Sequence, residues 1–226
     1  MAFIKICGIT NIEDAQAAID MGADALGFVF AESPRKVSPE TVQTIIARLP
    51  SDRLYIGVFV NHSLKEMLEI KTFCGIDTVQ IHDEKALDFS VNQGFKIIMG
   101  LRVKPNTSVP GSIDPNVILL LDTYSKDAHG GTGKTFDWQK AVSIAKQRPI
   151  ILAGGLTPDN VIHAIETVHP FAVDVSSGVE KNKGQKDHGK MKAFIHNVRK
   201  PTIHPSAHKS MTMKAHFTPN IQMASQ

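Results

Sequence analysis

Short apolar runs alternate along this chain with longer amphipathic segments. Eight runs have the length and composition of buried strands, at residues 3–7, 25–30, 54–60, 77–81, 96–99, 117–121, 149–153 and 171–175. Apolar residues at helical spacing lie between most of them, over residues 11–21, 39–48, 63–73, 138–146 and 159–167. Strands that alternate with helices form a parallel sheet covered by helices, and eight repeats favour a closed (β/α)8 TIM barrel of the α/β class.

An open doubly wound sheet is the alternative architecture. It usually has fewer strands, and its nucleotide-binding form carries a glycine-rich fingerprint after the first strand, where this chain has Cys7-Gly8-Ile9-Thr10. The pattern therefore favours the barrel. One repeat is irregular, because the prolines and glycine within residues 102–115 prevent a regular helix. We expect the fifth helix to be missing or vestigial.

The length and composition predict one folded domain and a tail. A chain of 226 residues with 42% hydrophobic content can bury one good core, which we assign to residues 1–200 as a barrel catalytic domain. Beyond Lys200 the sequence has no acidic residue and no periodicity. Residues 201–226 are therefore predicted to form a flexible tail.

Charge and cysteine content exclude several classes of function. The net charge is +3 and the basic residues are scattered, which favours a small anionic ligand over nucleic acid. Two cysteines are too few for a disulfide framework, and no signal peptide or apolar run of about 18 residues is present. We expect a cytoplasmic protein without a membrane partner. The histidines lack metal-ligand spacing, so no metal is predicted.

Cys7 ends the first apolar run and is the first candidate for chemistry. Alternation places Phe3, Lys5 and Cys7 on one face of the strand and the apolar Ile4 and Ile6 on the face that meets the helices. Cys7 should therefore point into the barrel mouth, where barrel active sites lie. A thiolate there can act as a base or a nucleophile, and a buried apolar cysteine is the alternative interpretation.

Asp122 closes the sixth run in the same way. Strands 1 and 6 are three steps apart in a ring of eight, so Cys7 and Asp122 are expected to face each other across the mouth. That arrangement suits removal of a proton at one atom and delivery of a proton at another. Capping of the following loop is the alternative role for Asp122.

Glycine-bearing loops follow the last three predicted strands. In barrels, the loops after strands 7 and 8 commonly bind phosphate through backbone N–H groups. A nucleotide-binding P-loop is excluded, because Ala128 occupies the place of its first glycine and no helix begins at Lys134. We expect phosphate binding, rather than simple turns, at Gly131, Thr132, Gly133, Gly154, Gly155, Ser177 and Gly178.

Four further polar residues are candidates to line the pocket. Arg35, in the loop after strand 2, can grip a carboxylate at two points, although a solvated loop arginine fits equally well. Gln80 and His82 share a face at the end of strand 4. Asp174 alternates inward on strand 8, and pairing with Lys5 is its alternative role.

Several of these residues lie in short motifs that follow one another along the chain. The motifs are Lys5-Ile6-Cys7-Gly8-Ile9-Thr10, Leu26-Gly27-Phe28-Val29-Phe30, Ser33-Pro34-Arg35, Val79-Gln80-Ile81-His82, Leu120-Leu121-Asp122, Gly130-Gly131-Thr132-Gly133-Lys134-Thr135-Phe136-Asp137-Trp138, Leu152-Ala153-Gly154-Gly155-Leu156 and Asp174-Val175-Ser176-Ser177-Gly178-Val179-Glu180. In this combination the chain resembles the phosphoribosylanthranilate isomerase family of tryptophan biosynthesis, from Phe3 to about Val198. Asp83 departs from the family pattern, in which a glycine commonly follows the histidine, and the tail extends beyond the family's usual end.

The resemblance implies an Amadori rearrangement of N-(5'-phosphoribosyl)anthranilate to 1-(o-carboxyphenylamino)-1-deoxyribulose 5-phosphate, with no cofactor. It implies Cys7 as the general base at ribose C2' and Asp122 as the general acid at the ring oxygen. Arg35 would hold the anthranilate carboxylate, Asp174 would lie near the bridging amine, and the glycine loops would receive the phosphate. The implied partner is this small phosphosugar, and the chain is expected to be a monomer or a homodimer.

Two other functions compete with this one. The first is another phosphosugar barrel enzyme, such as the histidine-pathway isomerase or indoleglycerol-phosphate synthase. The histidine-pathway enzyme is expected to use carboxylates as both acid and base, which Cys7 argues against. The second is a non-catalytic phosphate-ligand binder, which would need neither Cys7 nor Asp122.

Overall fold

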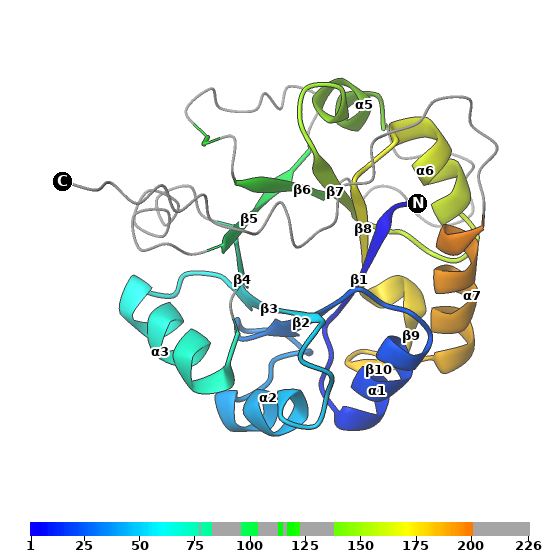
Figure 1. The fold of residues 1–226 in the computed structure, drawn as a ribbon. Coiled ribbons are helices and arrows are strands. Elements are labelled where there is room, and N and C mark those ends of the chain that lie inside the picture. The colour runs from blue at the N-terminus through cyan, green and yellow to red at the C-terminus, as the bar shows by residue number, and fades with distance from the viewer. Residues whose placement is uncertain (77, 83–95, 104–112, 115–116, 123–137, 201–226) are drawn as a thin grey trace.

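The eight predicted strands close into a parallel barrel surrounded by helices (Figure 1). The structure is a computed structural model that describes residues 1–76, 78–82, 96–103, 113–114, 117–122 and 138–200. The strands are β1 (Phe3–Cys7), β2 (Ala25–Val29), β3 (Leu54–Phe59), β4 (Thr78–Ile81), β5 (Lys96–Arg102), β6 (Ile118–Asp122), β7 (Ile150–Ala153) and β8 (Ala172–Val175). The helices around them are α1 (Ile12–Asp20), α2 (Pro39–Ile46), α3 (Leu64–Cys74), α5 (Gln139–Ala145), α6 (Val161–Val168) and α7 (His188–Arg199).

The alternation of side chains along the strands sorts them into two clusters. One fills the barrel and consists of Ala25, Leu54, Ile56, Ile98, Ile118, Leu120, Ile151, Ala153 and Ala172, with Phe3 and Phe171 packed against it. Ile4 and Ile6 belong to the larger cluster, which includes the buried faces of the helices. The first strand therefore directs Phe3, Lys5 and Cys7 inward, as the sequence pattern predicts.

Short polar side chains cap the N-termini of α1 and α3. Asn11 caps α1 by accepting a hydrogen bond from the Asp14 N–H at 2.8 Å. Ser63 and Glu66 form a reciprocal capping box at the start of α3, and Gly75 ends that helix in the left-handed conformation at φ 72°. These caps fix where α1 begins and where α3 begins and ends.

The predicted strand bounds agree with the structure to within about one residue, with one larger difference. β5 runs on to Arg102, because its backbone stays paired with β6 up to the register pair Arg102 and Asp122. Between β5 and β6 the described residues 103, 113, 114 and 117 are not helical, in line with a missing fifth helix. Residues 104–112 and 115–116 and the predicted tail at 201–226 lie outside the described residues.

A small hairpin after β8 is absent from the predicted elements. A 3-10 turn at Ser177–Val179 leads into β9 (Glu180–Asn182) and β10 (Gln185–Lys186), which pair antiparallel before α7 begins. Strands of two and three residues are too short to show an alternating pattern. No helix in the described part of the chain is long and apolar enough to cross a membrane.

Candidate active site

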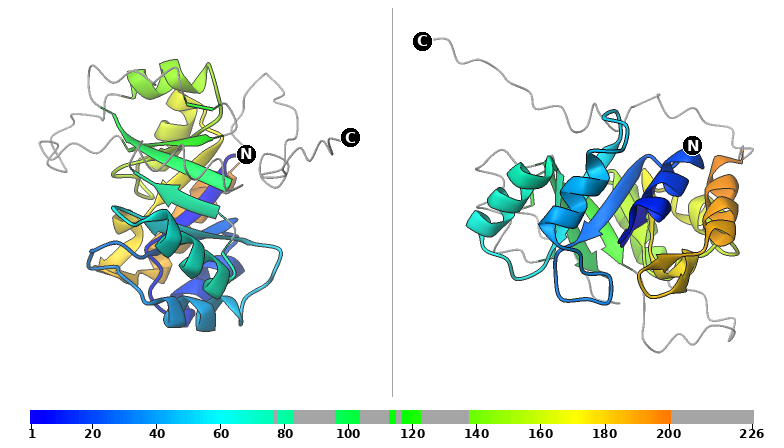
Figure 2. Two further views of the ribbon diagram at one scale, coloured as in Figure 1. Left: turned by 90° about the vertical axis from the view of Figure 1, so that its left-hand side faces the viewer. Right: turned by 90° about the horizontal axis from the view of Figure 1, so that it is seen from below.

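The candidate residues that the structure describes lie at the carboxyl end of the barrel. Seen from below, the loop after β2 and the hairpin of β9 and β10 lie at the same end of the barrel (Figure 2, right). Cys7, Asp122 and Asp174 lie at or near the last residue of β1, β6 and β8. His82 directly follows β4. Parallel strands bring these positions to one rim, because all their carboxyl ends point the same way.

A chain of polar contacts crosses the inside of this rim. Lys5, fully buried on β1, places Nζ 3.1 Å from Asp174 Oδ1 on β8 and donates a hydrogen bond of 2.9 Å to Gln80 Oε1 on β4. Gln80 in turn places Nε2 3.1 Å from His82 Nε2. Of the two roles open to Asp174, the structure shows the pairing with Lys5.

Cys7 lies close to Lys5, where this row of polar contacts begins. Gly27 on β2 makes the space for it, because a Cβ atom at Gly27 would be 2.8 Å from Cys7 Sγ and 3.2 Å from Lys5 Nζ. Burial raises the pKa of the Cys7 thiol, and the Asp174 carboxylate adds to this, while Lys5 and Lys186 act in the opposite direction. Burial also acts to lower the pKa of Lys5, but the Asp174 carboxylate and Cys7 outweigh it and raise that pKa. Lys5 is therefore a buried cation.

His82, Arg102 and Asp122 share the rim over β4, β5 and β6. His82 lies against Gly100, where an added Cβ would be 2.3 Å from the imidazole Cε1. Loss of solvent and the charge of Lys5 lower the pKa of His82, with a smaller contribution from Arg102, while Asp122 and Asp174 oppose them. The imidazole is thus neutral at neutral pH. The charges of Lys5 and Asp122 both influence the pKa of this imidazole. His82 therefore lies near the Asp122 carboxylate on β6 as well as near the polar contacts that start from Lys5 on β1.

Arg35 is held beside Cys7 by a carboxylate. Its guanidinium donates from Nε to Glu180 Oε1 at 2.7 Å and from Nη2 to Glu180 Oε2 at 2.6 Å. The hydrogen bond to Glu180 raises the pKa of Arg35, which burial opposes. Glu180 also lies 3.0 Å from Lys186 Nζ, and Lys186 donates to the Cys7 carbonyl at 2.6 Å. Arg35 is a fixed, paired group here, which differs from a solvated loop arginine.

The loops after β7 and β8 pack directly on each other. Gly154 and Gly155 adopt left-handed φ angles of 89° and 65°. Gly178 comes so close to the other loop that a Cβ there would be 1.8 Å from the Leu156 carbonyl oxygen. Ser177 begins the 3-10 turn. These four residues form one backbone surface, the geometry in which N–H groups can converge on an anion.

Sequence reasoning missed three members of the site. Lys186 lies in the unpredicted hairpin, and nothing in its surroundings marks it as buried. In the sequence Glu180 is the last residue of a motif, and nothing there indicates its role. Alternation along the first strand puts Lys5 on the inward face, but this signal indicates no more than a partner for Asp174. Gly131, Thr132, Gly133 and Asp83 lie outside the described residues.

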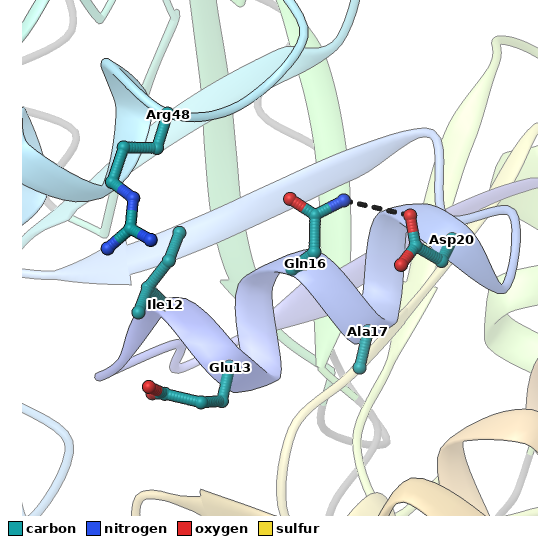
Figure 3. A pocket seen from close by; sticks show the side chains of 6 residues that line it. All are labelled: Ile12, Glu13, Gln16, Ala17, Asp20 and Arg48. Atoms are coloured by element: carbon teal, nitrogen blue, oxygen red, sulfur yellow. Dashed lines mark hydrogen bonds between the residues drawn. The ribbon is translucent and has the colours of Figure 1, made fainter.

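Neither a metal site nor the pocket found among the described residues offers an alternative to this rim as the active site. No group of three or more His, Cys, Asp or Glu side chains in the described ranges has the arrangement of a metal site. A pocket of about 420 Å³ lies on the outer layer, beside α1 (Figure 3). Its lining consists of Ile12, Glu13, Gln16, Ala17, Asp20 and Arg48. None of the residues that point into the barrel contributes to it.

Comparisons with known proteins identify relatives over nearly the whole described chain. Residues 4–197 match the family described as N-(5'phosphoribosyl)anthranilate (PRA) isomerase. An N-(5'-phosphoribosyl)anthranilate isomerase of Pelobacter propionicus is 49% identical over 197 residues, which cover 86% of this chain and 94% of that protein. One of Geobacter metallireducens is 46% identical over 201 residues, covering 88% of this chain and 100% of the relative.

Solved structures give the same result. The phosphoribosyl anthranilate isomerase of Thermotoga maritima superposes with a TM-score of 0.79 at 40% identity, covering 88% of this chain and 99% of that one. A phosphoribosyl anthranilate isomerase in complex with reduced 1-(o-carboxyphenylamino)-1-deoxyribulose 5-phosphate has a TM-score of 0.77 at 37% identity, with the same coverage.

Proposed function

Because this chain belongs to the N-(5'-phosphoribosyl)anthranilate isomerase family, we propose that Cys7 and Asp122 perform the reaction of that family, Cys7 as the base and Asp122 as the acid. The protein is an isomerase of tryptophan biosynthesis. It converts N-(5'-phosphoribosyl)anthranilate to 1-(o-carboxyphenylamino)-1-deoxyribulose 5-phosphate by an Amadori rearrangement. The histidine-pathway isomerase would use carboxylates as both acid and base, and a non-catalytic binder would need neither Cys7 nor Asp122.

The reaction needs one proton delivered and one removed on the same sugar. Asp122 protonates the ring oxygen as its bond to C1' breaks, which leaves a protonated Schiff base at C1'. The Cys7 thiolate then takes the proton from C2', giving an enolamine and a neutral thiol. The enolamine gains a proton at C1' and loses the proton of its C2' hydroxyl, which gives the aminoketone product and leaves the total number of protons on the sugar unchanged. General acid and base catalysis of this kind contributes about 10²–10⁴-fold each.

The position of the two groups is the observation that carries the proposal. Cys7 ends β1 and Asp122 ends β6, and both lie on inward-facing positions at one rim. The interior between their strands is polar at this level, with Lys5, Gln80 and His82 in a row. A sugar anchored above that row presents opposite sides to the thiol and to the carboxyl.

The remaining groups anchor the two charged ends of the substrate. Gly154, Gly155, Ser177 and Gly178 are proposed to receive the phosphate, together with Gly131, Thr132 and Gly133. Arg35 holds the anthranilate carboxylate with the guanidinium nitrogen that Glu180 leaves free, and Asp174 lies near the bridging amine. Gln80 and His82 line the floor of the pocket. Binding at both ends converts the proton transfers into effectively intramolecular steps.

Anthranilate fluorescence tests the proposal directly. Freshly made substrate should lose its fluorescence at a catalysed rate with the wild-type protein. Cys7→Ser should lower kcat by about 10²-fold or more while binding of the reduced product analogue changes little. The matched control is Cys74→Ser, at a buried thiol that donates to the Pro39 carbonyl at 3.3 Å in the outer layer. Equal losses of kcat and analogue binding in Cys7→Ser would reduce Cys7 to a packing role.

Assembly and location are part of the same proposal. A related solved structure concerns monomers made from a dimeric isomerase of Thermotoga maritima, at a TM-score of 0.76. We expect this chain to work in the cytoplasm as a monomer or a homodimer, and sedimentation of the purified full chain distinguishes the two states.

A further inference from the structure

Lys5 is a completely buried charge on the inward face of β1, and its position is costly. Its side chain is 0% exposed, in the strand that ends at Cys7. A buried ammonium is tolerated only where it is paired and hydrogen-bonded. Asp174 and Gln80 supply those partners from two other strands. A methionine or leucine would fill this space without that cost, so the charge itself needs an explanation.

The geometry directs that charge toward the thiol. Lys5 Nζ and Cys7 Sγ approach the same point over Gly27, at 3.2 Å and 2.8 Å from where its Cβ would lie. The two atoms therefore lie on the same side of β2, in the space that a side chain at position 27 would occupy. Asp174 and Gln80 hold the ammonium from two other strands, at 3.1 Å and 2.9 Å, and so fix its position near Cys7 Sγ.

We propose that Lys5 is a positioning residue that acts through Cys7, its charge stabilising the thiolate that takes the substrate proton. Lys5 keeps its own proton throughout, and the proton from C2' moves to Sγ to give the neutral thiol. This inference rests on the proposed role of Cys7 as the base. It assigns Asp174 and Gln80 a second role, which is to hold the ammonium in place.

The other charges near Cys7 do not replace Lys5. Burial and Asp174 raise the pKa of the thiol, while Lys5 is the strongest opposing charge and Lys186 a weaker one. The Lys186 ammonium is engaged by Glu180 and by the backbone carbonyls of Cys7 and Ser176. Arg35 lies over Gly8 and is paired with Glu180 at 2.6 Å. Removal of Lys5 leaves an uncompensated carboxylate beside the thiol.

The pH dependence of Cys7 alkylation tests this without reference to turnover. Full-length protein is treated with iodoacetamide across a pH series, and modification of Cys7 is followed by mass spectrometry. Cys74 serves as an internal reference, because burial raises the pKa of its thiol to about 11. Lys5→Met should raise the pKa of Cys7 by at least one unit, which reduces alkylation near neutral pH about tenfold.

A double variant guards against misfolding of Lys5→Met. In Lys5→Met with Asp174→Asn, no lone buried charge remains, so this variant should fold even if the single one does not. Its Cys7 pKa should lie between those of the wild type and Lys5→Met, because the thiolate has lost the cation but also the repelling carboxylate. The matched control is Lys192→Met on the exposed face of α7, which should leave the Cys7 pKa unchanged.

An unchanged Cys7 pKa in both Lys5 variants would overturn the inference, whatever their isomerase activity. The fluorescence assay reports separately on the proposed function. If the Lys5 variants shift the Cys7 pKa but the wild-type protein has no isomerase activity, the proposed function is contradicted and the effect of Lys5 on the thiol remains. If the wild-type protein is active but the Lys5 variants leave the Cys7 pKa unchanged, the proposed function remains and the inference about Lys5 is wrong.

Discussion

Lys5, Glu180 and Lys186 at the barrel mouth are each held by two or more partners. Glu180 is the clearest case, because its carboxylate accepts from Arg35 and from Lys186 at once. Burial acts to raise the pKa of Glu180, but Arg35 and Lys186 outweigh it and lower that pKa. Glu180 therefore stays ionised near neutral pH and keeps the guanidinium above Gly8, beside the thiol.

Glu180→Gln should weaken substrate binding more than it slows the chemical step. The amide cannot accept two charge-assisted bonds from Arg35, and one such bond contributes about 1.5–3 kcal/mol. We expect KM to rise about tenfold or more while kcat changes less, as measured by steady-state fluorescence kinetics. Glu32→Gln, at an exposed glutamate that pairs with Lys36 in the loop after β2, is the control and should change neither constant. A large fall in kcat at constant KM would place Glu180 on the proton path instead.

At the scale of elements, periodicity predicted what regular packing requires. Each strand must bury an alternating or fully apolar face, so all eight are visible in the sequence, with Phe3–Cys7 correct to the residue. Parity alone directed Cys7 and Lys5 inward. The end of β5 was less visible, because Arg102 is polar and its place in the strand depends on pairing with Asp122.

The same reasoning could not find the hairpin of β9 and β10. Its stability depends on tertiary contacts of Lys186 rather than on a local pattern: the backbone N–H donates to Asp14 Oδ2 at 2.9 Å, and Nζ donates to Glu180 and Cys7. A lysine in a polar loop has no sequence feature that indicates complete burial. Interactions of this kind are specified by the assembled fold, so the partners Glu180 and Lys186 became apparent only from the structure.

Contact between the loops after β7 and β8 makes Gly178 a sharp test of the phosphate surface. A methyl group there would overlap the Leu156 carbonyl, 1.8 Å away, and force the two backbones apart. Gly178→Ala should raise KM for the phosphorylated substrate at least about tenfold and lower the free energy of unfolding by about 1–3 kcal/mol. Steady-state kinetics and urea unfolding measure the two effects.

Gly75→Ala separates the binding effect from a loss of stability. Gly75 also resists a side chain, since its φ is 72°, but beyond its chain neighbours no atom of the described residues lies within 4 Å of where its Cβ would be. We expect a loss of about 1 kcal/mol in the free energy of unfolding with KM unchanged. Similar KM values in Gly178→Ala and the wild type would remove the loop after β8 from the phosphate surface.

The molecule as a whole is closed by polar contacts between its first and last described elements. Arg199 at the end of α7 donates to Asp24 Oδ2 at 2.7 Å and to the Gly22 carbonyl at 2.9 Å. Asp14 on α1 accepts from the Lys186 N–H and lies 2.8 Å from His188 Nε2. Pairing of β1 with β8 closes the ring of strands. We call this place, where the first and last elements meet, the seam, and the polar contacts above join the outer layer across it.

The seam makes the stability of the fold sensitive to acid through Asp14. Burial acts to raise the pKa of Asp14, but hydrogen bonds from Lys186, Asn11 and His188 outweigh it and lower that pKa below its ordinary value of 3.8. A lowered pKa in the folded state means that the unfolded state takes up protons first as the pH falls. The contribution of Asp14 is therefore complete above about pH 5 and is lost as the pH falls through 4 and below.

Asp14→Asn should reveal this contribution in urea unfolding measured between about pH 7 and pH 3. Near neutral pH the variant should be less stable than the wild type, because the amide cannot accept all three hydrogen bonds of the carboxylate. The difference should shrink as the pH falls below about 4, since protonation removes the same interactions from the wild type. A difference that stayed constant or grew in acid would show that the Asp14 carboxylate does not fasten α1 to the hairpin and α7.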